Sequence, residues 1–165
     1  MIVDRTDERA EACALELDDL EAALIAPHVA KIARAAQNSA TRRNYEELAA
    51  AIADRRLRPE HHGAVAALLE LLINSGRMRN RNGPTAEALA RNLYRRTEPG
   101  KAAVASAAAL GAALVKLKGQ RIENAGVSLR GPGSFALSLA TTDFHLVIRI
   151  DPSGCAVESL EVNLT

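Results

Sequence analysis

The chain of 165 residues is 48% hydrophobic and 25% charged, with a formal net charge of +1. This is the balance of one ordinary globular domain, and it excludes a wholly disordered chain. No apolar run approaches the roughly 20 residues that a membrane-spanning helix needs, so we expect no membrane partner. The acidic start, MIVDRTDERAEA, lacks an apolar signal core, and Cys13 and Cys155 make no disulfide framework. We therefore expect a reduced, cytoplasmic protein.

Aromatic side chains are scarce, at 2% of the chain, and tryptophan is absent. The four aromatic residues are Tyr45, Tyr94, Phe135 and Phe144. They are too scattered to form the stacking platforms with which proteins hold RNA or single-stranded nucleic acid, so we expect neither function. The core must instead be built from leucine, valine, isoleucine and alanine, through many small apolar contacts.

The first part of the chain has the apolar periodicity of helices. A first helix is predicted from Thr6, as its N-cap, to Ile25, because apolar residues recur every three or four positions opposite an acidic face. Pro27 is expected to break this helix or to start the next, which would cover residues 27–38. A third helix is predicted over residues 41–56.

Three further helices are predicted before residue 119. Residues 59–75 form the fourth, with a proline in its first turn, and Gly76 is a good residue to end it. The basic segment 77–84, RMRNRNGP, has strong turn chemistry and is predicted to be a loop. Thr85 is expected to cap the fifth helix. The sixth, over residues 101–118, consists mostly of small apolar residues and is expected to be buried on most sides.

After Gly119 the period of the sequence becomes two, which is typical of strands with one apolar face. Turn signals, GPG at 131–133 and DPSG at 151–154, separate the alternating stretches. The sequence therefore predicts an α+β fold. A bundle of about six helices in residues 1–118 precedes a four-stranded antiparallel meander in residues 119–165, which packs on the last, alanine-rich helix. We expect one compact domain.

The net charge of +1 conceals a strong segregation of charge along the chain. Residues 1–30 carry a formal charge of −6, residues 31–121 of +10 and residues 122–165 of −3. Thirteen of the seventeen cations in the central block are arginines, whose planar forks match phosphate groups and guanine edges. The sequence thus predicts a non-catalytic binding protein that contacts nucleic acid, in particular double-stranded DNA, through this block.

The candidate contact residues are arginines that occur in pairs or alternate within the basic segment. They are Arg42, Arg43, Arg77, Arg79, Arg81, Arg91, Arg95 and Arg96. We expect the fifth helix to make the contacts, because the sixth carries alanine where a helix that reads bases needs polar side chains. Two alternatives stay open. The arginines could reflect a composition of the kind found in GC-rich genomes, or they could pair with the acidic first helix.

The alternative function is a protein-interaction module, such as an adaptor, an inhibitor or an assembly subunit. The strand at residues 155–164 could form a free sheet edge, and the apolar stripe from Cys13 to Leu24 could dock against another helix. Either surface would also allow a homodimer. Both could equally serve the protein's own core.

No pattern in the sequence indicates an enzyme, a cofactor or a metal site. Gly131 and Gly133 lack the lysine and the following helix of a phosphate-binding loop, and no nucleophile elbow or HExxH motif is present. His61 and His62 are adjacent, so on a helix they point about 100° apart and do not readily share a metal ion. We expect them at an exposed helix start.

Overall fold

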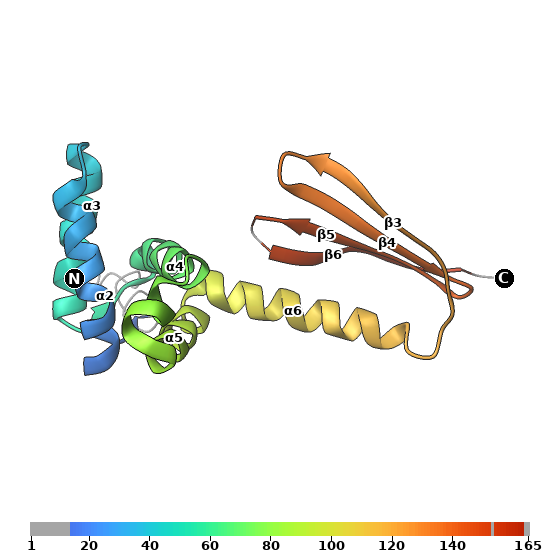
Figure 1. The fold of residues 1–165 in the computed structure, drawn as a ribbon, viewed down its shortest axis with the longest axis horizontal. Helices are drawn as coiled ribbons and strands as arrows, with labels where there is room; N and C mark the ends of the chain where they lie inside the picture. Colours follow the sequence, from blue (N-terminus) through green and yellow to red (C-terminus); the bar gives the residue numbers. More distant parts are fainter. Residues whose placement is uncertain (1–13, 153, 164–165) are drawn as a thin grey trace, which may run out of the picture. The chain divides into compact units, whose positions relative to one another are not determined.

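The computed structural model describes residues 14–152 and 154–163, apart from the side chain of Arg81. It has an α+β fold in which the helices come first and a four-stranded antiparallel sheet follows, as the sequence predicted (Figure 1). The chain divides into two compact units, residues 1–101 and residues 102–165. The predicted N-cap Thr6 and the cysteine at position 13 lie outside the described residues.

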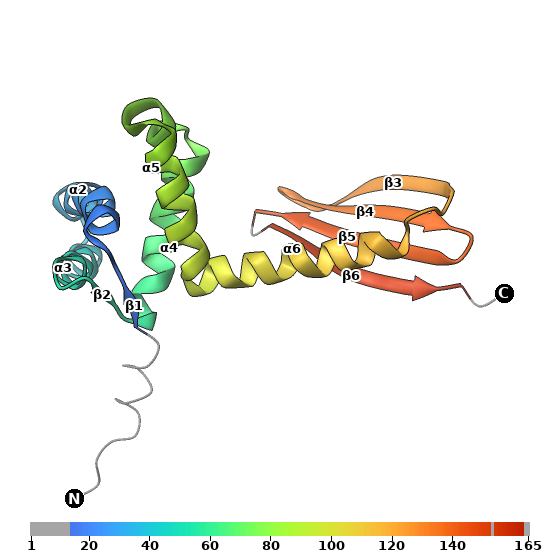
Figure 2. The same cartoon turned by 90° about the horizontal axis from the view of Figure 1, so that it is seen from below.

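The first unit is helical, with one small pair of strands. Its described elements are β1 (Leu15–Glu16), α2 (Asp19–Ala35), α3 (Ser39–Ala53), β2 (Arg56–Leu57), α4 (Pro59–Asn74) and α5 (Arg77–Arg96). Helix α2 lies beside α3, and α4 lies beside α5 (Figures 1 and 2). Their apolar faces meet in a core of thirteen buried residues, to which α4 contributes most: Val65, Leu68, Leu69 and Leu72.

Helix α2 begins later than the sequence suggested. Asp18 is its N-cap, and the Asp18 side chain accepts a 2.7 Å hydrogen bond from the Glu21 N–H. The Glu21 side chain in turn accepts a 3.1 Å hydrogen bond from the Asp18 N–H. This capping box fixes the start of the helix at Asp19, so the predicted helix from residue 6 to 25 is wrong for residues 14–18.

Pro27 lies inside α2 and does not break it, contrary to the prediction. Proline lacks the N–H that would bond the carbonyl of Ala23, four residues earlier. Both Pro27 and Ala23 are exposed, so water can replace the missing partner. One continuous helix therefore runs through the position where we predicted a boundary between the helices at residues 6–25 and 27–38.

The basic segment 77–84 is largely helical, so the predicted loop is wrong. Helix α5 starts directly after Gly76, whose φ of 67° is left-handed, and its backbone is non-helical at Gly83 (φ 83°, ψ 175°). Met78 is only 1% exposed, and its burial stabilises this first part of the helix. The glycine and the proline that follows it therefore produce a kink rather than a loop.

The second unit consists of most of α6 (Glu98–Lys116) and the sheet. Its strands are β3 (Ile122–Gly131), β4 (Ser134–Thr141), β5 (Phe144–Asp151) and β6 (Gly154–Val162), which neighbour one another in chain order. All three pairings are antiparallel, which confirms the predicted meander. Thr97 caps α6, because its hydroxyl accepts a 3.2 Å hydrogen bond from the Gly100 N–H.

The alanine-rich helix packs on the sheet, as predicted. Ala113 of α6 forms a core cluster with Leu146 and Ile148 at the middle of β5. Figure 2 shows α6 crossing the sheet at β5 and β6, with β3 at the far edge. The expectation that this helix is buried on most sides is wrong, because from Ala102 to Lys116 only Ala113 is buried. A single sheet covers one side of the helix and leaves the rest exposed.

Candidate functional site

The face of α5 that points away from the core carries guanidinium and amide groups. Buried Ala90 and Leu93 anchor the opposite face, and Arg91, Asn92 and Arg95 are exposed within about one turn. The Arg95 side chain makes no hydrogen bond or ion pair with another described residue. The whole helix has six arginines and one carboxylate in its 20 residues. It therefore presents an excess of positive charge to solvent.

Glu87 is that carboxylate, and two arginines share it. Arg91, one turn later, donates to Glu87 Oε1 from Nη2 at 2.6 Å and from Nε at 3.1 Å. Arg79 Nε lies 4.0 Å from Glu87 Oε2. The Glu87 side chain is 17% exposed, whereas those of Arg79 and Arg91 are 72% and 55% exposed. One negative charge thus orders two guanidinium groups and leaves one positive charge uncompensated.

Arg96 points instead toward α2. Its Nη1 lies 2.6 Å from Glu21 Oε1, and its Nη2 donates to the carbonyl oxygen of Glu16. Glu21 is 3% exposed, so the guanidinium compensates a buried charge. Arg55 similarly lies 2.5 Å from Asp19 at the start of α2. Two arginines therefore pair with acidic residues of the first long helix, and the ion pair of Arg96 stabilises the packing of α5 against α2.

Arg42 and Arg43 lie at the start of α3, and both are exposed. Arg42 Nη2 donates to the carbonyl oxygen of Ala36 at 2.9 Å, which satisfies a group at the end of α2. Arg43 and Arg77 are exposed, and their side chains make no hydrogen bond or ion pair with any described residue. The side chain of Arg81 lies outside the described part of the protein.

The predicted contact residues thus separate into groups. Arg79 and Arg91 meet at one carboxylate, and Arg91 shares an exposed helix face with Arg95. Arg42 and Arg96 are engaged with other parts of the chain. Among the described side chains, it is the exposed set on α5 that a ligand could meet as a group.

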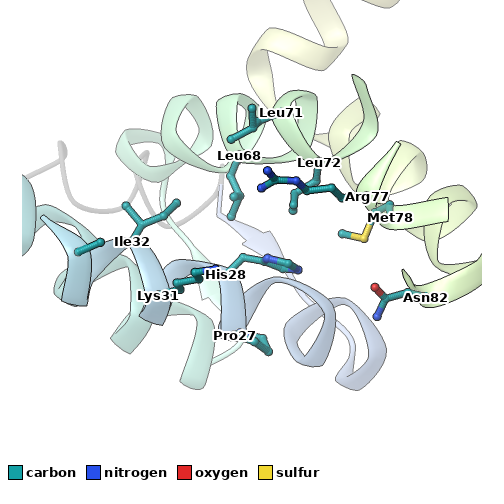
Figure 3. Close-up of a pocket in the computed structure, with 11 residues that line it drawn as sticks. Pro27, His28, Lys31, Ile32, Leu68, Leu71, Leu72, Arg77, Met78 and Asn82 are labelled. Atoms are coloured by element: carbon teal, nitrogen blue, oxygen red, sulfur yellow. The ribbon is translucent and has the colours of Figure 1, made fainter. Parts of the chain in front are cut away.

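A groove between α2, α4 and the start of α5 is a feature that the sequence does not predict (Figure 3). Its volume is about 370 Å³. Its floor is apolar, because Leu68, Leu72 and Met78 are each no more than 4% exposed. Lys31 and Arg77 also line it, and no aspartate or glutamate is among the described residues that do. Figure 3 shows the Arg77 side chain extending from α5 along the α4 side of the groove.

Sequence reasoning misses this groove because its residues come from three helices whose arrangement no local pattern encodes. The one signal is Leu71, which lies beside the apolar stripe of α4 and is 59% exposed. A large apolar side chain next to a complete stripe widens the apolar face beyond what the core needs. Together with Ile32 of α2, it lines the groove.

A second cleft, of about 560 Å³, has a mixed lining. It contains the carboxylates of Glu47, Asp54 and Glu60 and the guanidinium groups of Arg56 and Arg58. Arg58 Nη1 lies 3.8 Å from Glu60 Oε1, so part of this charge is compensated internally. The cleft therefore favours neither an anion nor a cation strongly.

His62 is only 2% exposed, so the expected exposed position at the helix start is wrong for this residue. Position 62 lies three residues before Val65 and seven before Leu69, on the buried face of α4. Neither ring nitrogen of His62 hydrogen-bonds to a described residue, and the same holds for Nδ1 of His61. No group of three or more histidine, cysteine, aspartate or glutamate side chains in the described ranges could hold a metal ion.

Two titratable groups in the described part of the chain have shifted pKa values. Tyr94 Oη donates to Glu70 Oε1 at 2.8 Å, between α5 and α4. Burial, then this hydrogen bond and the negative charge of Glu70, raise the pKa of Tyr94 above its usual value near 10. Lys101 Nζ lies 2.7 Å from Glu98 Oε1 and lowers the pKa of that exposed carboxyl. Both shifts lead away from neutral pH, which is the opposite of what general acid–base catalysis needs.

Comparisons with known protein families, curated proteins and solved structures found no match. None of the described helices combines the length and the hydropathy that crossing a bilayer requires. Function therefore has to follow from the exposed groups of the molecule itself.

Proposed function

We propose that this protein is a non-catalytic binding protein that contacts double-stranded DNA through the exposed face of α5, with Arg91, Asn92 and Arg95 at its centre. The observation that supports this most is the composition of the helix, which has six arginines and one carboxylate. Arginine and asparagine are the side chains that bond guanine and adenine edges in the major groove with two hydrogen bonds each.

The dimensions of α5 suit this role. After the kink at Gly83, residues 84–96 form a helical segment roughly 20 Å long, at about 1.5 Å per residue. The major groove of B-DNA, about 12 Å wide, admits such a helix. Arg77 and Arg79 precede the kink and would meet phosphates, which position a protein without reading sequence. Glu87 holds the Arg91 side chain in an ordered conformation before any ligand arrives.

The test is fluorescence anisotropy with a labelled duplex at about 50 mM and about 200 mM salt. We expect Arg95→Ala to weaken binding by about 5- to 10-fold and to lower the salt dependence by about one phosphate contact. Arg130→Ala is the matched control, because Arg130 is also exposed, at 53%, but lies in the sheet unit. No binding at low salt, or equal effects of the two substitutions, would contradict the proposal.

The groove favours a second candidate function, which is binding of an acidic protein segment. Its apolar floor and its two cations, Lys31 and Arg77, fit an amphipathic helix with leucines on one face and glutamates beside them. Neither cation makes an ion pair with a described residue, so an incoming carboxylate would find both available.

A labelled acidic amphipathic peptide, with leucine at every third or fourth position and glutamate between, tests this second function. We expect Arg77→Glu to abolish binding, because it reverses a charge at the groove. Arg43→Glu makes the same change at an exposed arginine of α3 that does not line the groove, and it should leave binding intact. Equal losses in both variants would indicate attraction by net charge alone.

A further inference from the structure

One row of residues across the sheet is buried in the middle and exposed at one end. The strand register aligns Val127 of β3 with Leu137 of β4, Ile148 of β5 and Val157 of β6. Ile148 is 4% exposed in the cluster with α6, whereas Val127 is 69% exposed. Leu129, two residues further along the same face, is also 69% exposed. Helix α6 therefore covers only part of the apolar face, and β3 is left uncovered.

The side of α6 that points away from the sheet is apolar as well. Ala113 faces the sheet, so the helical period places Val104 and Val115 on the far side, where they are 49% and 69% exposed. With Ala108 and Gly111, both exposed, they form a stripe at spacings of four, three and four residues. No charged residue occurs on α6 between its two lysines.

The second unit exposes far more apolar surface than its small core would lead one to expect. Its core cluster has three buried residues, against thirteen in the helical unit. Eight of the ten large hydrophobic side chains that are exposed in the described chain belong to it. They are Val104, Leu114, Val115, Ile122, Val127, Leu129, Phe135 and Val162.

The area of the α6 stripe and the uncovered β3 region approaches one partner's share of a stable dimer interface. If a fully exposed large apolar residue offers roughly 150–200 Å², those on the outer stripe of α6, on β3 and at the adjoining start of β4 present on the order of 600 Å². They are Val104, Val115, Ile122, Val127, Leu129 and Phe135. The largest apolar patch on a typical monomer is about 300–600 Å². Each partner in a standard protein–protein interface buries about 800 Å². The exposed apolar surface therefore lies at the upper limit for an ordinary monomer and approaches the area that one partner buries in an interface.

We infer that this surface binds a second copy of the chain, and that the outer stripe of α6 in each copy packs over β3 of the other. The helix stripe and the strand are both apolar and both uncovered in one chain. A two-fold axis therefore lets the stripe of each copy cover β3 of the other. Gly111 and Ala108 allow close approach at the middle of the stripe. This surface differs from the β6 edge and from the N-terminal stripe, and the inference does not rest on DNA binding.

Sedimentation velocity of the full chain, from low micromolar to high micromolar concentration, tests the inference. We expect a species of twice the 17.6-kDa chain mass. Leu129→Glu and Val115→Lys should each raise the dissociation constant by about tenfold or more, with unchanged far-UV circular dichroism, because both side chains are exposed within one chain. Leu20→Glu, at a 70% exposed leucine of α2, is the matched control and should leave the dimer intact.

A mixing experiment tests which surfaces meet. In a heterodimer of the Leu129→Glu and Val115→Lys chains, one helix–strand contact brings lysine to glutamate and the other is unaltered. The mixture should therefore recover the dimer that each variant alone has lost. If helix packs on helix and strand on strand, no contact of the heterodimer brings lysine to glutamate, and mixing should not restore the dimer. That result would show that the proposed helix-on-strand arrangement is wrong. A monomeric wild type, or a dimer that Leu20→Glu breaks and Leu129→Glu does not, would overturn the inference altogether.

Discussion

The ion pair between Arg96 and Glu21 gives a quantitative test of how α5 is held to α2. Glu21 is 3% exposed, and its carboxylate lies 2.6 Å from Arg96 Nη1. Arg96→Met keeps much of the aliphatic volume and leaves this buried charge without its counter-ion. Breaking a fully buried pair costs about 3–5 kcal/mol. Because the Arg96 side chain is 43% exposed, water partly replaces it, and we expect a loss of about 2–3 kcal/mol.

A double-mutant cycle separates the pair from the other roles of its members. Glu21→Gln keeps an oxygen for the Asp18 N–H of the capping box but removes the buried charge, so we expect a loss of only about 1–2 kcal/mol. In the double variant no unpaired charge is buried. Its loss should therefore fall short of the sum of the single losses by about 1–2 kcal/mol.

Tyrosine fluorescence in urea measures these losses in the helical unit alone. Both tyrosines, Tyr45 and Tyr94, belong to residues 1–101, and the chain has no tryptophan. Arg95→Met is the matched control, because this neighbouring arginine is exposed and has no ion pair with a described residue, and it should change stability by less than about 0.5 kcal/mol. An equally small effect of Arg96→Met would refute the reasoning, since Glu21 would then not depend on its partner.

Four further substitutions test single features of the helical unit. Gly83→Ala should destabilise the protein by about 1–3 kcal/mol in urea unfolding, because φ 83° with ψ 175° suits only glycine, although no atom lies within 4 Å of the added carbon. Gly63→Ala, inside α4, is the control and should stabilise the protein by about 0.5–1 kcal/mol. Equal effects of the two substitutions would contradict this reasoning. Tyr94→Phe should remove about 1 kcal/mol with the hydrogen bond to Glu70. Because the folded pKa of Tyr94 is raised, its contribution is present below about pH 10 and is lost as the pH rises through the folded value. The wild-type minus Tyr94→Phe absorbance titration should therefore show a midpoint above 10, and a midpoint at or below 10 would disprove the coupling. His62→Leu should raise the urea midpoint or leave it unchanged, since it removes two buried ring nitrogens that have no hydrogen-bond partner among the described residues. A loss of stability of more than about 1 kcal/mol would show that the imidazole does have a hydrogen-bond partner.

The sheet could be predicted because its signals are local. Period-two alternation marks each strand, and the glycines at the turns, Gly133 with φ 71° and Gly154 with φ 128°, mark where the chain reverses. A meander then needs no long-range information, since each strand pairs with the next. What the pattern could not show is that α6 covers β5 and β6 but not β3. That depends on how one helix sits across four strands.

The errors in the helical part arise where solvation or burial outweighs local residue chemistry. Pro27 is tolerated where both the proline and Ala23, whose carbonyl loses its helical partner, are exposed residues. The segment after Gly76 is helical because Met78 reaches the core, although seven of the eight residues from Arg77 to Pro84 favour turns or carry charge. His62 is buried by the period of α4, against the polarity of its ring. In each case the decisive contact is with water or with the core, and not with the neighbouring residues in the sequence.

The residue types of the candidate site could be predicted from the sequence. Which of its side chains remain free to contact a ligand could not. Arg95 and Arg96 are adjacent in sequence and equivalent in charge. Arg96 finds Glu21, 75 residues earlier in the chain, whereas Arg95 faces solvent without a described partner. Summing charges over a segment cannot distinguish these two fates. The choice is made by the packing of α5 against α2, which turns one side of the helix toward a carboxylate and the other toward solvent.

The guanidinium face lies in the helical unit and the uncovered apolar surface in the other, so DNA binding and self-association can be separated by mutation. A dimer would carry two copies of the α5 face, and the second contact with one duplex would then be intramolecular. A duplex long enough for both copies should therefore bind more tightly than a short one, by roughly 10²-fold or more when the geometry allows both contacts. Leu129→Glu should remove this difference and leave the affinity for the short duplex unchanged. A weaker affinity of that variant for the short duplex would mean that β3 itself contacts DNA, and the apolar surface would then not be reserved for self-association.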